Sequence, residues 1–489
     1  MIAGQRTTEN DLDKRRVIAG LQPGRAWMRR GLLLAAVTPL LLAGCGSLPR
    51  INPDLALPSQ PVRMEGAHGP LSSQQSGAIL ARLKLGADDT QIFERHLGLV
   101  QEMGGSPLVV GNKVELLLDG PATYASMFAA INAAKDTINL ETYILEPDEI
   151  GQSLVDALLV RQSTGVQVNL IYDSVGSLST PKEFFQPLLD AGAHVLEYNP
   201  INPLKTRKDW TFNERDHRKL LVVDGRIAYV GGINISSVYS SGSFGSPFSR
   251  SKKARHTQDG PTWRDTHLRI EGPVAAEFQK LFMTTWEKQK GENLGGREYF
   301  PQLGNKGPEV MLAIGSSPGD PYSLMYATLI SAIHSAESQV FLTNAYFLPD
   351  PQLLAALKGA AARGVDVRLL LPGKSDSDLV LNASRSFYQE LLSSGIKVYE
   401  RQDALLHSKT AMIDGVWSTV GSTNLDWRSR LNNQEIDAVI LGQDFGTHMQ
   451  AMFDQDLLAS RQITLDDWEN RSLLSRLREA GARLWARLL

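Results

Sequence analysis

The 489-residue chain has little of two things, cysteine and long apolar sequence. Its one cysteine, Cys45, excludes an internal disulfide and a cysteine-based metal cage. Its conspicuous apolar run, Gly31–Leu42, is shorter than the roughly 20 residues that a membrane-spanning helix needs. Hydrophobic residues make up 42% and charged residues 21%, which is typical of globular proteins and excludes a disordered chain or a polytopic membrane protein. The length suffices for two or more domains with cores of their own.

A strong charge of either sign is also missing, because the formal net charge is only −3. The charge is uneven, however. Residues 1–44 hold seven basic and three acidic residues, so the remainder of the chain carries a formal charge of −7. An acidic body is a poor partner for a phosphate polyanion. The charge therefore counts against a nuclease, and no nucleic-acid partner is expected.

The first 45 residues have the order of a secretory signal. Met28–Arg30 is a basic start, Gly31–Leu42 is a short apolar core, and Leu42–Cys45 ends in small residues before the cysteine. This ending is similar to a bacterial lipobox, in which the chain is cut before the cysteine and the cysteine is lipidated. Residues 1–45 are therefore interpreted as a signal segment, with Met28 as an alternative start. The other interpretation is an uncleaved hydrophobic anchor with an incidental cysteine.

Lipidation of Cys45 would tether the protein to a membrane outside the cytoplasm, on the periplasmic side. Gly46 and Ser47 lack the aspartate that retains many lipoproteins at the inner membrane. In a cell with two membranes, the outer membrane is therefore favoured.

Beyond the signal, the sequence predicts a tether and a duplicated body. From Gly46 to about Gln75 the chain is rich in proline, serine and glycine, which is typical of a tether, and a helix is expected before residue 105. A helix, a turn glycine and a buried strand then occur twice, with strands in Gly165–Ile171 and Gly364–Leu370. Such repetition indicates duplicated α/β units. The predicted divisions are 46–105 for tether and helix, 106–300 for lobe 1, 301–465 for lobe 2, and 466–489 for a C-terminal amphipathic helix.

Lobe 1 contains about 20 residues more than lobe 2 between matching positions, and the extra residues fall in Tyr239–Thr262. The stretch is rich in serine and glycine and includes a basic knot, Arg250–Arg255. It is interpreted as an exposed loop. A gate or lipid-headgroup contact and a merely solvated insertion are equally favoured.

The C-terminal segment has leucines at helical spacing with arginines between them. Together with Trp485, this pattern would allow the helix to lie on an anionic membrane surface. Helices of this kind more often pack on their own domain, and that interpretation is favoured.

The pattern His-x-Lys-x-x-x-x-Asp occurs twice, once in each half. Its residues are His217, Lys219 and Asp224 in the first copy and His407, Lys409 and Asp414 in the second. Each copy is followed by Gly-x-x-Asn, which ends at Asn234 and at Asn424. Two copies at the same place in a repeat, with the same sequel, indicate a duplicated functional site.

Each copy is predicted to form a strand, an Asp-Gly turn and a second strand, since Asp-Gly between apolar runs is a strong hairpin signal. Residues two apart on a strand share a face, so each histidine should point the same way as its lysine. Asp224 and Asp414 lie about 16 Å further along the strand and cannot reach the same phosphate. These aspartates are therefore assigned to holding the hairpins.

Neither copy is a complete catalyst. Displacement at a phosphodiester without metal needs a nucleophile, an acid for the leaving alkoxide and positive charge for the developing anion. A facing pair of copies supplies all three, with the amides of Asn234 and Asn424 holding phosphoryl oxygens. A histidine that attacks must be neutral and held at its other nitrogen by an acceptor. Asp265 and Glu435, carboxylates at matching repeat positions, are the candidates. No cluster of residues has metal-ligand spacing.

The duplicated motif resembles that of the phospholipase D superfamily, and over Leu108–Leu465 the chain is more similar to bacterial cardiolipin synthases. The stretches that carry this likeness begin at Glu141 (Glu-Thr-Tyr-Ile-Leu), Tyr172 (Tyr-Asp-Ser-Val-Gly-Ser), Gly231 (Gly-Gly-Ile-Asn-Ile), Trp263 (Trp-Arg-Asp-Thr-His) and Gly421 (Gly-Ser-Thr-Asn-Leu-Asp-Trp-Arg-Ser). The resemblance implies two similar α/β sandwich lobes related by a pseudo-twofold axis, with one active site at their interface. It also implies transfer through a phosphohistidine, with His217 as nucleophile and His407 as acid and then base, and with no metal or other cofactor. The implied substrates are phospholipids in a membrane, with phosphatidylglycerol as donor and phosphatidylethanolamine as a second candidate.

The chain departs from this family at its front end, where typical members carry two membrane-spanning helices and this one has a lipobox. Two rival functions stay open. Water could replace the lipid acceptor, which would give a phospholipase D or a nuclease. An inactive lipoprotein that binds envelope partners is the other rival, although both motifs are intact.

Overall fold

The computed structural model describes residues 62–85, 106–201, 213–240 and 262–488, with residues 92, 93, 96, 97 and 100 between the first two ranges. Arg50–Leu489 form one compact unit, which contains both lobes. The expected signal with Cys45, the tether up to residue 61 and residues 241–261 of the insertion lie outside the described residues.

Lobe 1 is built on a mixed sheet. In spatial order its strands are β6 (His194–Tyr198), β5 (Gln167–Asp173), β4 (Thr137–Thr142), β8 (Lys219–Val223), β9 (Ile227–Gly231), β11 (His267–Glu271) and β3 (Leu108–Leu117). The first three are parallel to one another, and the later neighbours are antiparallel. The helices are α4 (Gly120–Ala133), α5 (Glu149–Ser163), α6 (Gln186–Asp190) and α7 (Ala275–Lys288), with short 3-10 turns at η1 (Lys182–Phe185) and η2 (Ser237–Tyr239).

Lobe 2 repeats this order. Its strands are β20 (Ser460–Ile463), β15 (Lys397–Arg401), β14 (Asp366–Pro372), β13 (Gln339–Asn344), β17 (Lys409–Ile413), β18 (Trp417–Gly421), β19 (Asn433–Leu441) and β12 (Glu309–Ser316). Its helices are α8 (Leu324–Ser335), α9 (Pro351–Ala362), α10 (Asp378–Arg385), α11 (Tyr388–Ser393), α12 (Trp427–Leu431), α13 (Gln443–Leu458), α14 (Leu465–Glu469) and α15 (Leu473–Arg483). The predicted fold class, two similar α/β lobes, is confirmed.

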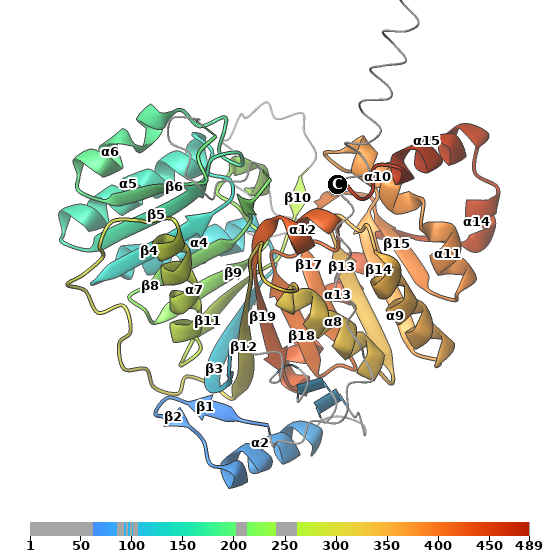
Figure 1. The fold of residues 1–489 in the computed structure, drawn as a ribbon, viewed down its shortest axis with the longest axis horizontal. Helices are drawn as coiled ribbons and strands as arrows, with labels where there is room; N and C mark the ends of the chain where they lie inside the picture. The colour runs from blue at the N-terminus through green and yellow to red at the C-terminus, as the bar shows by residue number, and fades with distance from the viewer. Residues whose placement is uncertain are drawn as a thin grey trace, which may run out of the picture. The chain divides into compact units, whose positions relative to one another are not determined.

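The two sheets join edge to edge where β3 pairs antiparallel with β12, so that they form one continuous sheet (Figure 1). Two shorter pairings also cross between the lobes. β7 (Arg215–Asp216) of lobe 1 runs parallel to the start of β19, and β10 (Trp263–Arg264) of lobe 1 runs parallel to β16 (Leu405–Leu406) of lobe 2. The β7–β19 pair ends directly before His217 and Glu435, and the β10–β16 pair ends directly before Asp265 and His407.

Successive side chains of each strand point to opposite faces of the sheet, so each strand contributes to two hydrophobic cores. In β8, Leu221 and Val223 face a core beneath α4 and α5, whereas Leu220 and Val222 face a second core. This second core is shared by both lobes and is covered by α7 and α13, which supply large apolar side chains such as Phe282 and Phe453. Strands buried on both faces need a continuous apolar sequence, and β8 has one. The shared core explains why the halves pack as one body.

The tether prediction is wrong for its last residues. A small antiparallel pair, β1 (Met64–Gly66) and β2 (Gly69–Pro70), precedes helix α2 (Ser73–Leu85), and β1 also runs parallel to β3. Met64 is buried in the core of lobe 2. Composition favoured a tether here, but burial of Met64 and pairing of β1 with β3 hold the segment on the body of the protein.

The expected C-terminal helix, 466–489, is broken in two. Ser472 caps α15 by accepting from the N–H of Ser475 at 3.1 Å, and this cap separates α15 from α14. α15 does pack on its own lobe, but through Ala482, while its leucines face outward. Within the ranges that the structure describes, no helix is both long and apolar enough to cross a membrane.

Candidate active site

One cavity of about 360 Å³ brings the two sequence motifs together. His217 and Asn234 from the first repeat line it, and so do His407 and Asn424 from the second. The two asparagines follow β9 and β18, the strands after each Asp-Gly turn. The expected interface site therefore exists as a space between the lobes.

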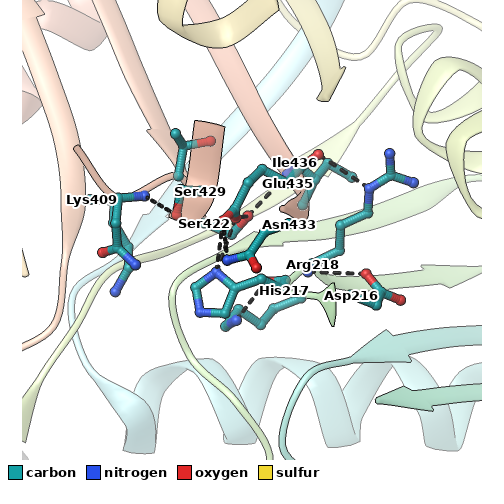
Figure 2. A network of polar contacts seen from close by, with 12 residues as sticks. Asp216, His217, Arg218, Lys409, Ser422, Ser429, Asn433, Glu435 and Ile436 are labelled. Carbon is teal, nitrogen blue, oxygen red and sulfur yellow. Dashed lines mark hydrogen bonds and ion pairs between the residues drawn. The ribbon is translucent and has the colours of Figure 1, made fainter. Parts of the chain in front are cut away.

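His217 is held by a carboxylate from the opposite lobe. Its Nδ1 lies 3.0 and 3.1 Å from the two carboxylate oxygens of Glu435 (Figure 2). The same carboxylate accepts from the hydroxyl of Ser422 at 2.5 Å and from the side-chain amide of Asn433 at 3.2 Å. Glu435 is fully buried and its orientation is fixed by these donors.

His407 has the mirrored arrangement. Its Nδ1 lies 2.7 Å from an Asp265 carboxylate oxygen, and the other oxygen of Asp265 accepts from the N–H of Thr266 at 2.7 Å. Gly232, which matches Ser422 of the other lobe, leaves room here, because a Cβ on it would lie 2.2 Å from the Asp265 carboxylate. The two carboxylates are thus at matching positions but are supported differently.

The crossing pairs β7–β19 and β10–β16 produce this exchange of partners. The N–H of His217 donates to the carbonyl of Gln434 at 3.0 Å, and the N–H of His407 donates to the carbonyl of Arg264 at 2.8 Å. In both cases the acceptor directly precedes the carboxylate residue, so the backbone register sets each histidine beside its partner. Each imidazole is therefore oriented by the lobe to which it does not belong.

Both histidines are neutral in this environment. Burial lowers the pKa of His217 and of His407 to about 4. Burial alone would raise the pKa of the Glu435 and Asp265 carboxyls, but their histidine partners and nearby lysines hold both below the usual range. The proton of each pair therefore belongs on Nδ1, donated to the carboxylate. Nε2 keeps its lone pair and, among the described residues, has no hydrogen-bond partner.

The motif lysines form a buried cationic layer behind the histidines. The ammonium of Lys219 donates to the carbonyl of His217 at 2.6 Å, and that of Lys409 donates to the carbonyl of His407. Burial lowers the pKa of Lys219 to about 7 and that of Lys409 to about 8. His217 and Lys219 also both contact the ring of Tyr143, at 5.0 and 5.2 Å.

The two asparagines are engaged unequally. The amide oxygen of Asn234 accepts from the N–H of Ile144 at 3.1 Å, and its nitrogen lies 3.2 Å from the hydroxyl of Tyr239. The amide oxygen of Asn424 is buried and has no partner within the described part of the chain. Asn424 is therefore the less committed of the two.

The motif aspartates lie in turns away from the cavity. Asp224 accepts from the backbone N–H groups of residues 135–137 at 2.7–3.1 Å, and Asp414 accepts in the same way from residues 337–339 at 2.8–3.2 Å. Both have positive φ, 51° and 52°, which aspartate tolerates in tight turns. Each carboxylate thus ties its hairpin to the loop that enters the neighbouring strand, β4 or β13.

Sequence reasoning missed the aromatic wall of the cavity, which consists of Tyr143, Tyr239, Trp263 and Tyr346. The rings of Trp263 and Tyr346 lie 5.2 and 6.2 Å from that of His407, and the Tyr239 hydroxyl lies 3.3 Å from its Nδ1. Tyr143 and Tyr346 both follow the strand that pairs with the motif strand of their repeat, but they are one position out of register. Thr142 lies opposite Lys219 and Asn344 opposite Lys409, so that Tyr346 matches Ile144. A tyrosine close to the end of the strand in each repeat was the only signal in the sequence. Tyr239 begins the insertion that was interpreted as an exposed loop, but it is 1% exposed.

Known proteins share this architecture and much of this sequence. A family model described as cardiolipin synthase, PLD-like domain, matches residues 127–241 and 329–457. The cardiolipin synthase of Alkalihalophilus pseudofirmus is 34% identical over 411 residues, which are 83% of this chain and 77% of that protein. Cardiolipin synthase A of Pseudomonas putida is 34% identical over 399 residues, covering 80% of this chain and 78% of that protein.

A solved structure supports the fold. The phosphatidylserine synthase of Haemophilus influenzae Rd KW20 superposes with a TM-score of 0.55 at 13% identity, covering 80% of this chain and 98% of that one. At this identity the likeness concerns the fold alone. The sequence relationship and the repeated domain together identify this chain as a member of the cardiolipin synthase family, whose fold is built from phospholipase D-like domains.

Proposed function

We propose that this protein is a cardiolipin synthase that transfers a phosphatidyl group from phosphatidylglycerol to the hydroxyl of a second phospholipid through a phosphohistidine. The observation that supports it best is the facing pair of neutral, carboxylate-held histidines in one cavity. Two imidazoles divide the nucleophile and acid roles that one motif could not fill. Phosphatidylethanolamine is a second candidate donor.

In the first step, Nε2 of His217 attacks the phosphorus of the donor, and the bond from phosphorus to the glycerol oxygen breaks. The entering phosphodiester is an anion, and its charge raises the pKa of His407, so His407 can carry the proton that the leaving alkoxide takes. Lys219, Lys409 and the amide of Asn424 supply the positive charge and donor for the phosphoryl oxygens. Glu435 stabilises His217 as it becomes positively charged.

In the second step, the acceptor hydroxyl gives its proton to His407, its oxygen bonds to phosphorus, and the bond from phosphorus to His217 breaks. Water can follow the same path and would yield phosphatidic acid. A lipid acceptor is favoured by the aromatic wall, which lowers the polarity around His407.

The outward face of α15 and of the turn that follows it supports docking on a membrane. Leu473, Leu477 and Leu484 are 72%, 62% and 83% exposed, and Trp485 is 49% exposed. Leu488, which follows, lines the active-site cavity. Apolar side chains flanked by arginines suit the surface of an anionic bilayer, and this face adjoins the cavity into which a bilayer lipid must pass.

The same proposal includes lipidation of Cys45 and a location outside the cytoplasm, with the outer membrane favoured, on the strength of Leu42–Cys45. Cys45→Ser should block lipidation and cleavage, so that the membrane-extracted protein has the mass of the precursor. Wild-type protein with an unmodified Cys45 would refute the lipoprotein assignment.

The decisive experiment incubates the purified protein with vesicles of labelled phosphatidylglycerol and separates the lipid products. Cardiolipin with release of glycerol is the expected result. Phosphatidic acid as the sole product would make the protein a hydrolase, and the absence of any product from labelled phospholipid would contradict both. The His217→Ala variant serves as the inactive control.

A further inference from the structure

Arg428, in α12, is the only lysine or arginine among the described residues that line the active-site cavity. In the part of the chain that the structure describes, its guanidinium has no hydrogen bond or ion pair. Other arginines nearby are engaged. Arg430, two residues on, pairs with Asp350 at 3.0 Å and stacks on Tyr326 at 3.8 Å. Arg428 therefore contributes an uncommitted positive charge to the cavity, whereas Arg430 holds the fold.

The acidic residues of the same wall are already occupied. Asp426 accepts from the N–H of Ser429 at 2.7 Å as the cap of α12, and burial raises its pKa to about 7. Asp376 accepts from the hydroxyl of Tyr346 at 2.8 Å. Neither carboxylate forms an ion pair with Arg428 in the described part of the chain, although the positive charge of Arg428 acts to lower the pKa of Asp426 against the larger effect of burial. The guanidinium therefore keeps its hydrogen-bond donors for an anionic ligand.

The duplication shows that Arg428 is not part of the common phosphoryl-transfer machinery. Arg428 lies four residues after Asn424, and the residue four after Asn234 in the other repeat is Val238. The histidines, lysines, asparagines and carboxylates all occur in both halves, but this cation occurs in one. A group present on one side only suits a task that distinguishes one alcohol from the other.

The proposed reaction contains such a task. The leaving alcohol, glycerol, has no charge, whereas the entering alcohol is a phospholipid with a phosphodiester of its own. We propose that Arg428 binds the phosphodiester of the acceptor phospholipid and so favours a lipid alcohol over water in the second step. This inference rests on the proposed function. A guanidinium donates two parallel hydrogen bonds to phosphate oxygens, which also orients the lipid.

A competition experiment tests this role. Full-length Arg428→Gln and wild-type protein are given labelled phosphatidylglycerol with ethanol, an acceptor that has no phosphate. Cardiolipin and phosphatidylethanol then arise from the same phosphohistidine, so their ratio reports the second step and is independent of donor binding and of the amount of active enzyme. The ratio should fall by about 10- to 100-fold in Arg428→Gln, the loss expected for hydrogen bonds to a charged group. Arg428→Lys keeps the positive charge but cannot donate two parallel hydrogen bonds, so its product ratio should lie between those of the wild type and Arg428→Gln.

Arg226→Gln removes an exposed arginine at the turn after β8 and serves as the matched control, with an unchanged ratio expected. An unchanged ratio in Arg428→Gln overturns the inference, whether total activity is kept or lowered. Wild-type protein that makes phosphatidylethanol and phosphatidic acid but no cardiolipin would instead overturn the proposed transferase. The two failures are therefore distinguishable.

Discussion

At the scale of single residues, the proposed chemistry depends on two imidazoles that are equal in protonation but different in surroundings. His217 has Glu435, Ser422 and Asn433 near it, whereas His407 lies among aromatic rings. Both have a depressed pKa, and the Nε2 of each has no hydrogen-bond partner among the residues that the structure describes. Geometry therefore permits either to attack, and the assignment of His217 as nucleophile is tested by the leaving group.

His217→Ala and His407→Ala should each lower turnover of phosphatidylglycerol by about 10⁴-fold or more, since the two groups act as a unit. A p-nitrophenyl phosphodiester should separate them, because p-nitrophenolate leaves without a proton. The first release of p-nitrophenol, followed by absorbance, should persist in His407→Ala, where only the second step lacks its base, and should be absent in His217→Ala. The reverse pattern would exchange the roles, and near-normal activity of either variant on lipid would rule out a shared site.

The buried titratable groups predict a bell-shaped pH dependence of kcat/KM. His217 must be neutral to attack, and its pKa of about 4 means that activity is lost as the pH falls through that value. The lysines must be charged, and their pKa values of about 7 and 8 mean that activity is lost as the pH rises through this range. Initial rates at low substrate, with circular dichroism as the check on folding, measure this profile. A level profile from about pH 5 to about pH 9 would show that the lysine charge is not needed.

At the scale of elements, the two Asp-Gly hairpins place the site by being tied to their neighbours. Asp224 satisfies the backbone N–H groups of residues 135–137, which precede β4. Asp224→Ala should lower the free energy of unfolding by about 1–3 kcal/mol, the cost of leaving such donors without an acceptor. Urea unfolding followed by fluorescence measures the change.

The same variant should keep most of its turnover per folded molecule, because Asp224 does not line the cavity. Asp190→Ala, an aspartate in an exposed hydrogen bond on α6, is the control and should be neutral. Loss of turnover in fully folded Asp224→Ala, on the scale of a histidine variant, would place this aspartate in the reaction.

Helix α15 carries the second prediction at this scale. Leu477→Asp and Leu484→Asp introduce a charge on the exposed apolar face, so each should weaken binding to phosphatidylglycerol vesicles by about 10-fold or more. Leu458→Asp on α13, at a leucine that is 81% exposed, is the matched control and should bind normally. Vesicle sedimentation is measured with a chain that starts at Gly46 and so lacks the lipidation site, which is reasonable because Arg50–Leu489 form a compact unit. If all three variants bound vesicles as tightly as the wild-type protein, this face would be excluded as the membrane-docking surface.

At the scale of the whole molecule, the exchange of carboxylates makes each histidine depend on the other lobe. Asp265 lies in lobe 1 but holds His407, and Glu435 lies in lobe 2 but holds His217. Arg264 strengthens the same contact, since its guanidinium donates to both carboxylate oxygens of Asp456 at 3.0 and 2.9 Å. Both lobes are therefore needed to build the candidate site.

This exchange of carboxylates can be tested by comparing the activities of each carboxylate variant with those of the histidine variants. Asp265→Asn should behave like His407→Ala, losing activity on lipid by about 10²- to 10⁴-fold while keeping p-nitrophenol release. Glu435→Gln should behave like His217→Ala and lose both activities. If Asp265→Asn resembled His217→Ala instead, each carboxylate would serve the histidine of its own lobe.

The sequence by itself determined the duplicated α/β lobes, the two hairpins and the residues that the cavity would gather. It could do so because side-chain alternation, turn residues and a repeated motif are local patterns, readable over a few residues. The aromatic wall could not be predicted in the same way, because Tyr143 and Tyr346 are not at equivalent positions of the repeats and Tyr239 stands at the edge of an insertion.

Only the tertiary structure decided which carboxylate holds which histidine. The two candidates occupy equivalent repeat positions, so no local pattern distinguishes them, and the partners are 142 and 218 residues apart. The pairings that decide it, β7 with β19 and β10 with β16, span two residues each and leave no signature in the sequence. The direction of the α15 leucines was undecided for a related reason. Helical spacing shows that an apolar face exists, but whether it meets the protein or the solvent depends on the surface already packed beneath it.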